Sequence, residues 1–354
     1  MNARLTAAAR HRLFWPVLVL AILLLSNLIF TPGFFKVEVR EGHLYGSLID
    51  ILRFGAPLIL VALGMTLVIA TGGIDLSVGS VVAICGALAC LMISKEADQN
   101  AVSGVLIAVG LALGLALVLG LWNGFLVAGV GIQPIIATLI LMVAGRGLAQ
   151  LITDGQIITI NSSPYERIGA GYLWTMPVSV LIALAVTAAA VVLTRRSALG
   201  MLLESVGGNA EASRLSGIRS RQITLTVYVF CGLCAGIAGL MVSSNVSGAD
   251  GNNAGLFIEL DAILAVVIGG TSLAGGRFSI GGTVLGALII QALSTTIYTV
   301  GVPPEITLLV KALVVTAVCL IQSPAFRAKV FRRRSRPPTA PAVADEQPRV
   351  EVPV

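Results

Sequence analysis

Long apolar runs, separated by short polar segments, follow one another along almost the whole chain. A helix needs about 20 mostly apolar residues to cross a bilayer core of about 30 Å. The runs predict about ten transmembrane helices, and the eighth is short because glycines follow it, as in a re-entrant half-span. The predicted spans cover residues 13–35, 51–70, 76–93, 102–121, 134–151, 176–194, 223–243, 260–273, 280–298 and 306–323.

Composition supports a membrane protein. Of the 354 residues, 56% are hydrophobic and 11% are charged, whereas a soluble domain is about 45–50% apolar and about 25% charged. So few charges cannot coat a water-soluble surface of this size, which argues against an ordinary cytosolic enzyme and against a disordered protein. The predicted fold class is all-α, a polytopic membrane protein in which glycines break some helices.

The basic residues indicate the orientation. Most of the 23 Lys and Arg residues fall in segments that lie on one side of the membrane if the N-terminus is inside. Cytoplasmic loops carry such an excess, so we expect both termini in the cytoplasm. The formal charge of +6 then needs no nucleic-acid partner.

The two ends of the chain lie outside the predicted transmembrane domain, residues 13–323. Residues 1–12 form a short basic cytoplasmic N-terminus; the apolar run after it exceeds the 7–15 residues of a signal-peptide core, which favours an uncleaved first span. Residues 324–354 mix prolines with charges and predict a disordered cytoplasmic tail. The Arg332–Arg334 cluster could contact anionic membrane lipid, or it could simply fix the topology.

Signs of an enzyme are weak. The chain has two His residues and no cluster with zinc-site spacing, and it has no phosphate-binding loop of the G-x-x-x-x-G-K-[ST] type. Cys231 and Cys234 have redox spacing, but they lie in an apolar helix, where Cys is a small packing residue. We therefore do not expect an enzyme, and we expect no metal or cofactor.

Polar groups at membrane depth are functional candidates because they are costly there. Residues 70–80 interrupt a long apolar stretch with three glycines and Asp75. Broken backbone survives in a membrane only where protein or a water-filled cavity satisfies it, and transporters form their sites at such breaks. The alternative is a tight hairpin in which Asp75 caps the next helix.

A second polar stretch, residues 243–253, follows the seventh span on the outer side. Its amides and carboxylate suit sugar hydroxyls, which need both donors and acceptors; a solvated turn is the alternative. Glu259 and Asp261 then open the eighth span, and we expect Arg146 and Lys311 to pair with carboxylates. The proposed substrate path comprises Asp75, Ser77, Asn123, Asn245, Asp250, Asn252 and Asn253.

Further glycines suggest close helix packing. Residues 268–278 form a second glycine break that resembles the first and hints at an internal repeat. Small residues four apart let membrane helices approach closely. Such pairs occur at Gly110/Gly114, Gly120/Gly124, Gly232/Gly236 and Gly282/Gly286.

The inside loop 195–221 is the longest hydrophilic connection between spans. Its residues 201–206 and 210–215 predict two short helices, with a break at Gly207-Gly208 and Asn209 as a helix cap. Short exposed helices suit docking to a soluble partner; a plain connector is the alternative. The docking candidates are Glu204, Asn209, Glu211, Arg214 and Gly217.

With these motifs, the chain resembles the integral-membrane permeases of bacterial sugar ABC importers, the ribose/xylose/galactoside type. Residues 72–79 match that family's most specific signature, 262–273 and 275–277 its second, and 206–218 its ATPase-contacting loop. Within the family, the resemblance is closest to galactofuranose permeases. Residues 144–153, 248–256 and 301–305 carry that match.

The resemblance implies a type II importer-like permease that carries a monosaccharide, galactofuranose or a related hexose or pentose. It also implies a cytoplasmic ATPase subunit, a periplasmic sugar-binding protein and a second permease chain, identical or merely similar. Alternatives are a branched-chain amino-acid-type ABC permease, an ion-coupled secondary transporter, and a scaffold subunit without a path. Asp75 is the only deep carboxylate available for ion coupling.

Overall fold

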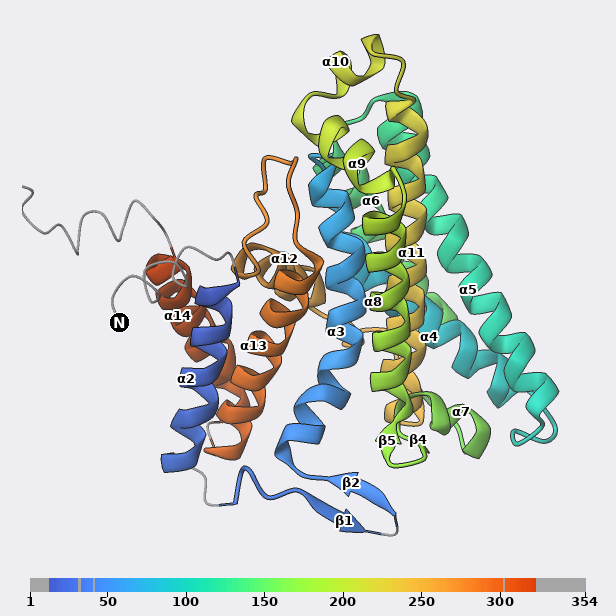
Figure 1. The fold of residues 1–354 in the computed structure, drawn as a ribbon. Coiled ribbons are helices and arrows are strands. Elements are labelled where there is room, and N and C mark those ends of the chain that lie inside the picture. Colours follow the sequence, from blue (N-terminus) through green and yellow to red (C-terminus); the bar gives the residue numbers. More distant parts are fainter. Residues whose placement is uncertain (1–12, 31–32, 41, 302, 323–354) are drawn as a thin grey trace, which may run out of the picture.

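The computed structural model describes residues 13–30, 33–40, 42–301 and 303–322, so the predicted terminal segments 1–12 and 324–354 lie outside it. The described chain is mostly helical, in agreement with the predicted all-α class (Figure 1). Its principal helices are α2 (Phe14–Phe30), α3 (Ser47–Ala70), α4 (Val78–Ser94), α5 (Val102–Gly124), α6 (Pro134–Ile152), α8 (Val178–Arg196), α11 (Ser220–Asn245), α12 (Ile258–Ile268), α13 (Ile280–Thr299) and α14 (Pro304–Gln322). The short helices are α7 (Ser163–Gly169), α9 (Leu199–Gly208) and α10 (Ala210–Leu215).

Six of the described helices are long and apolar enough to cross a membrane: α3, α5 with its π-helical extension Phe125–Val130, α6, α8, α11 and α13. The first predicted span is shortened, because its helix, α2, ends at Phe30. The eighth covers only 11 residues, since the helix α12 ends at Gly269 and the following Gly270 adopts a positive φ of 86°. Glycine tolerates that conformation, so the backbone leaves the helix there.

Two neighbouring helices, α3 and α11, form the centre of the bundle (Figure 1). From Gly55 to Ala70, only Pro57 of α3 has more than minor exposure, as expected for a membrane helix surrounded by protein. The helix α11 packs on α3, α4 and α5.

Glycines permit this close packing, as three of the four predicted pairs confirm. A Cβ atom at Gly232 would lie 2.9 Å from the Cα of Gly120, and Gly124 and Gly236 face α11 and α5 in the same way. Gly282 and Gly286 face α12. The prediction for Gly110 and Gly114 is wrong within this chain, because no other residue lies within 4 Å of where their Cβ atoms would be.

Three small two-stranded sheets lie at the end of the bundle opposite α10, which we call the outer end. The antiparallel pairs are β1 (Glu38–Arg40) with β2 (His43–Tyr45), β3 (Ile157–Thr159) with β6 (Gly248–Asp250), and β4 (Tyr172–Leu173) with β5 (Met176–Pro177). In the second pair, Ile157 is opposite Asp250. The sheets fold the outer loops back over the helix ends.

Candidate functional site

Three glycine-rich segments that are distant in sequence meet at the inner end, where α9 and α10 lie. The N–H of Gly276 donates to the carbonyl oxygen of Ala70 at 3.0 Å. A Cβ atom on Gly275 would lie 3.1 Å from the Cα of Gly72, and Gly207 packs directly on Ala70 and Gly276. We call Gly72, Gly207, Gly275 and Gly276 the glycine junction.

The junction requires glycine for two reasons. Gly72 and Gly275 adopt positive φ values of 82° and 87°, which L side chains rarely adopt. Gly207 has no Cβ atom to separate its backbone from those of α3 and the 269–279 loop. The loop that holds α9 and α10 therefore contacts both glycine breaks that the sequence identified.

Asp75, Ser77 and Asn123 form one hydrogen-bonded set beside the first break. The backbone N–H and the hydroxyl of Ser77 donate to Asp75 Oδ1 at 2.9 and 2.6 Å. The amide of Asn123 donates to Ser77 Oγ at 2.8 Å and to Asp75 Oδ1 at 3.4 Å. Ser77 itself occupies the N-cap position of α4, so Asp75 holds the turn two residues earlier rather than capping the helix.

This set is closed to solvent in the present conformation. Its three side chains are at most 2% exposed, and none lines a described cavity. Among the described residues, Asn123 Oδ1 and the nearby Tyr228 hydroxyl nevertheless have no hydrogen-bond partner. Tyr228 also borders a cavity of about 210 Å³ beside Gly72, Gly73 and the inner end of α11. Orphaned buried polar atoms are rare enough to need a reason.

At the outer end, Asp250 organises the turn after β6. Its Oδ1 accepts the N–H groups of Asn252 and Asn253 at 2.8 and 3.2 Å, and its Oδ2 accepts the Asn253 amide at 2.8 Å. These bonds, led by the Asn253 amide, lower the pKa of Asp250 despite partial burial. The carboxylate is thus ionised and already occupied by its own turn.

Two of the predicted path residues, Asn245 and Asn253, line a larger cavity at the same end. This outer cavity has a volume of about 320 Å³, within the usual range for small-molecule sites. The Arg53 guanidinium lies in its wall and donates to Asn245 Oδ1 at 2.6 Å. Gln291 and Asp261 also line it, whereas Asn252 does not.

Sequence reasoning missed Arg53 and Gln291 as candidates. A charge at the start of an otherwise apolar span is a signal for Arg53, since such charges face protein or water rather than lipid. Gln291 gives a weaker signal, because a single amide in α13 is common in helix packing. Of the two expected ion pairs, Lys311 pairs with Asp261 at 2.5 Å. Arg146 instead donates to the backbone oxygen of Ala254 at 2.6 Å, and the described residues give it no ion pair.

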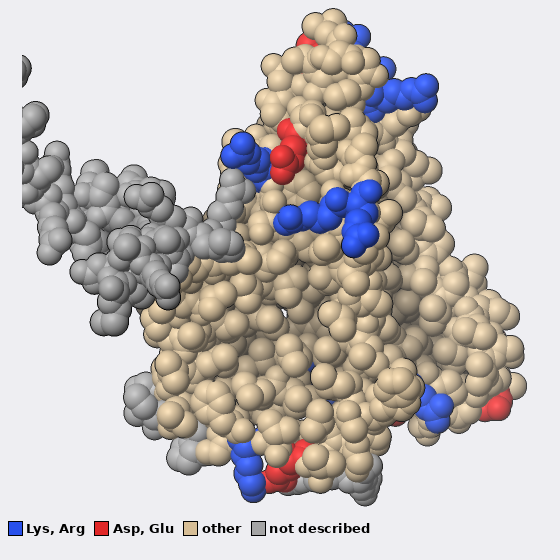
Figure 2. All heavy atoms as spheres, in the orientation of Figure 1, with Lys and Arg blue, Asp and Glu red and all other residues tan. Residues whose placement is uncertain are grey.

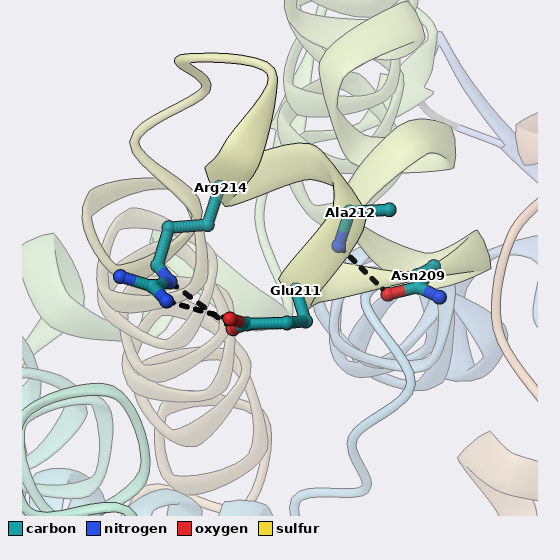
Figure 3. A network of polar contacts seen from close by, with 4 residues as sticks. All are labelled: Asn209, Glu211, Ala212 and Arg214. Atoms are coloured by element: carbon teal, nitrogen blue, oxygen red, sulfur yellow. Dashed lines mark hydrogen bonds and ion pairs between the residues drawn. The ribbon is translucent and has the colours of Figure 1, made fainter.

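The inside loop folds into two short helices, α9 and α10, as predicted. The expected break at Gly207-Gly208 is wrong, because both glycines are the last residues of α9 and Asn209 separates the two helices. Asn209 caps α10 by accepting the N–H of Ala212 at 2.9 Å, and Arg214 forms two bonds with Glu211, the shorter 2.6 Å (Figure 3). The hydrogen bond and charge of Arg214 lower the pKa of Glu211. Both ionised side chains are exposed at the tip of the molecule.

The loop has the surface expected of a docking element. Leu215 and Met201 are 77% and 68% exposed, and apolar side chains that protrude from a polar rim are typical of protein contact sites. Glu204 lines a separate cavity of about 530 Å³ with Arg195 and Arg277. Gly217 ends the loop's helical part with a positive φ of 84°.

Charges mark the two ends of the molecule. On the face drawn in Figure 2, Lys and Arg gather toward the end that carries α10, and a largely uncharged band separates them from the charges at the outer end. The basic residues in the inner loops are Arg195, Arg196, Arg214, Arg219, Arg221 and Arg277. Such a band is what a bilayer requires of a multi-pass protein.

The described residues contain no group of three His, Cys, Asp or Glu side chains that could hold a metal ion. Cys231 and Cys234 are free and buried, and Cys231 packs against Gly64 of α3. This agrees with a packing role.

Comparison with known proteins identifies relatives over almost the entire chain. Residues 47–319 match the family described as "Branched-chain amino acid transport system / permease component". The galactofuranose transporter permease protein YtfT of Escherichia coli is 49% identical over 342 residues, 94% of this chain and 98% of that protein. The fructose import permease protein FruF of Bifidobacterium longum is 39% identical, over 94% of each chain.

The ribose import permease protein RbsC of Escherichia coli is 37% identical, over 86% of this chain and 92% of that protein. No solved structure matches the chain. The similarity to these relatives spans both glycine breaks and the inside loop, because each alignment covers most of this chain.

Proposed function

This chain belongs to the family of sugar ABC importer permeases, and we propose that it carries a monosaccharide through the bacterial inner membrane. The observation that carries the proposal is the 49% identity to a galactofuranose permease over nearly the full length of both chains. Galactofuranose is accordingly the favoured sugar, with a related hexose or pentose next. The chain is a transport subunit, and a separate ATPase subunit would hydrolyse ATP.

The amino-acid alternative has less support. The matching family is described by branched-chain amino acids, but the whole-chain relatives reported above are named for sugars. In the outer cavity, Arg53, Asn245 and Gln291 lie among mainly apolar residues. These three polar side chains can donate to and accept from sugar hydroxyl groups. An ion-coupled transporter needs no loop for docking an ATPase, whereas the inside loop 195–221 of this chain suits that role.

We further propose a type II importer-like arrangement of about ten spans with both termini in the cytoplasm. Helices at every predicted span support the number, and the excess of basic residues near α9 and α10 supports the orientation. The permease domain would cover residues 13–323, between the basic N-terminus 1–12 and the proline-rich tail 324–354. A second permease chain, identical or similar, would complete the path, and a periplasmic binding protein would deliver the sugar.

The glycine junction supports a mechanism. The ATPase would contact the docking candidates Glu204, Asn209, Glu211, Arg214 and Gly217 in the loop 195–221. Because Gly207 packs on the end of α3 and on the 269–279 loop, a movement of the docking helices would reach both glycine breaks without intermediate side chains. Rocking of the helices around a fixed site is how transporters alternate access.

The two polar clusters would then serve opposite ends of the path. Asn245, Asn253, Asp250 and Asn252 lie at the outer end, where the sugar arrives. Asp75, Ser77 and Asn123 lie at the inner end, where they are closed off from solvent. The unpartnered Asn123 Oδ1 and Tyr228 hydroxyl support a conformation in which this end opens and water or sugar satisfies them.

Sugar uptake by membrane vesicles tests the function. The vesicles contain this chain with its ATPase, its partner permease and the sugar-loaded binding protein. Replacing the lysine of the ATPase's phosphate-binding loop should abolish uptake, because that lysine contacts the ATP phosphates. Undiminished uptake would refute ATP drive, and uptake of leucine in preference to every sugar tested would refute the substrate class.

A further inference from the structure

A pocket lined by both apolar and polar residues opens on the apolar flank of the bundle, between α4, α6 and the start of α12. It has a volume of about 410 Å³ and shares Leu256 with the outer cavity. Four side chains give it its chemical character, and we call it the flank pocket. They are Arg146, Gln150, Phe257 and Glu259.

The surroundings of the flank pocket are apolar. On α6, Leu139, Val143 and Leu148 are 45%, 68% and 45% exposed, and Leu260 of α12 is 48% exposed. Arg146 lies about 18 Å from the start of α6, well inside the apolar layer. Charged residues at such depth face a water-filled cavity or another protein chain rather than acyl chains.

Glu259 provides a hydrogen-bond acceptor that has no donor among the described residues. The side chain is 3% exposed, and Oε2 has no hydrogen-bond partner among the described residues. Gly79 of α4 makes room for the carboxylate, because a Cβ atom there would collide with Oε2. Glu259 also lines the flank pocket, so a ligand that enters the pocket could bring the donor that this buried oxygen lacks.

Arg146 supplies donors from the facing wall. One of its nitrogen atoms donates to the backbone oxygen of Ala254 at 2.6 Å. This bond fixes the side chain, and a guanidinium has five N–H groups in all. The Gln150 amide adds a donor and an acceptor one helical turn further along α6.

Phe257 contributes a ring that the backbone holds in an unusual conformation. It precedes α12 with a φ of +63°, which is rare for a bulky residue. Its side chain is 44% exposed and lines the flank pocket. Strain of this kind concentrates at functional sites.

We propose that the flank pocket is a sugar-contacting station on the transport route. Sugar hydroxyls would donate to Glu259 and accept from Arg146 and Gln150, while the C–H face of the ring would lie on Phe257. The inference rests on the proposed function, because the second permease chain would cover the apolar rim and separate the pocket from lipid.

Thiol labelling tests whether the pocket holds water. The test variant is Gln150→Cys, and its control is Leu148→Cys, which lies on the same helix but outside the pocket. Both are made in the assembled importer that also carries Cys319→Ser. The native Cys85, Cys90, Cys231 and Cys234 are buried. A charged methanethiosulfonate should modify Gln150→Cys at least about tenfold faster, since thiolate forms poorly in apolar surroundings. Equally slow reactions would overturn the inference.

Sugar uptake then tests contact with the substrate. Glu259→Gln keeps the shape of the side chain, so the ATPase should still co-purify and receptor affinity should not change. We expect about a tenfold lower maximal uptake rate and a changed ratio of rates across galactose, ribose and fructose. An unchanged ratio would refute sugar contact. Loss of ATP dependence in the wild-type importer would instead refute the proposed function, whatever the labelling result.

Discussion

Polar side chains at membrane depth are satisfied by partners that the sequence did not reveal. Arg53 and Asn245 are 192 positions apart yet bond at 2.6 Å, and Lys311 and Asp261 belong to different helices. Each pair removes exposed polarity from an apolar environment, where an unpaired group is costly. Residue-level chemistry therefore depends on which helices are neighbours.

Asn245→Ala tests the outer cavity. It leaves the Arg53 guanidinium without its acceptor, and hydrogen bonds to charged groups contribute about 1.5–3 kcal/mol. We expect a lower midpoint of thermal unfolding in detergent and slower sugar uptake. Asn161→Ala is the control, because that side chain is exposed and outside the cavity. If both variants behave like the wild type, the cavity has no role in transport.

Glu211→Ala and Arg214→Ala test the docking surface. The pair is exposed, and exposed ion pairs contribute little to stability, so thermal unfolding of the permease should not change. Co-purification of the ATPase should fall for both variants. The control Arg219→Ala removes an exposed arginine outside α10. Full retention of the ATPase by both test variants would exclude these residues from docking.

The Glu211–Arg214 ion pair also predicts how ATPase docking depends on pH. Arg214 lowers the pKa of Glu211, so the ion pair is complete above the ordinary glutamate pKa of about 4.3. It is lost only as the pH falls through the lowered folded value. ATPase co-purification should therefore stay constant between about pH 8 and about pH 5. A midpoint near neutrality would contradict a role for this carboxylate.

At the scale of elements, glycine decides how closely helices and loops approach. The glycine junction joins the docking loop to both glycine breaks through backbone contacts alone. Elsewhere, the Gly232 and Gly120 backbones meet between α11 and α5. Rigid, directly packed elements transmit a displacement with little loss, because close-packed interiors yield little.

Gly207→Ala tests the junction. The new methyl group would collide with the Ala70 carbonyl and the Gly276 nitrogen, and overpacking costs about 1–3 kcal/mol. We expect sugar uptake to fall sharply while the ATPase still binds. Its neighbour provides a matched control: a Cβ atom on Gly208 meets nothing within 4 Å. Normal uptake by Gly207→Ala would show that the junction does not couple the two ends.

At the scale of the whole molecule, charge and shape define two ends. The α10 end is basic, and the outer end carries the small sheets and the outer cavity. In the orientation proposed above, the first end faces the cytoplasm, in line with the positive-inside tendency. A sugar would then enter from the sheet-capped end and leave past the glycine junction.

Cysteines at the two ends test this orientation. Trp174 and Leu215 are 87% and 77% exposed, at the outer and inner ends. An impermeant thiol reagent added to spheroplasts should label Trp174→Cys at once. Leu215→Cys should react only after permeabilisation, since it faces the cytoplasm. The reverse pattern would invert the topology.

Much of this architecture follows directly from the sequence. Apolar runs predicted the helices, because a backbone in lipid must satisfy its own hydrogen bonds. Local pattern and the Asn209 cap predicted α9 and α10, because capping acts over three or four residues. The position of the break was wrong, since Gly207 and Gly208 still belong to α9. The sequence also predicted that the segment with Asp75 interrupts the apolar stretch. It did not predict that Ser77 and Asn123 both donate hydrogen bonds to the Asp75 carboxylate.

The tertiary structure decided the rest. Gly110 and Gly114 have the same spacing as Gly232 and Gly236, yet only the second pair packs against another helix. Spacing fixes which residues share a helix face, whereas helix rotation fixes what that face meets. For the same reason, local pattern identified the glycine breaks but not their meeting, and it gave no sign that Glu259 and Arg146 border one pocket. Those neighbours depend on contacts between distant segments, which only the packed chain brings together.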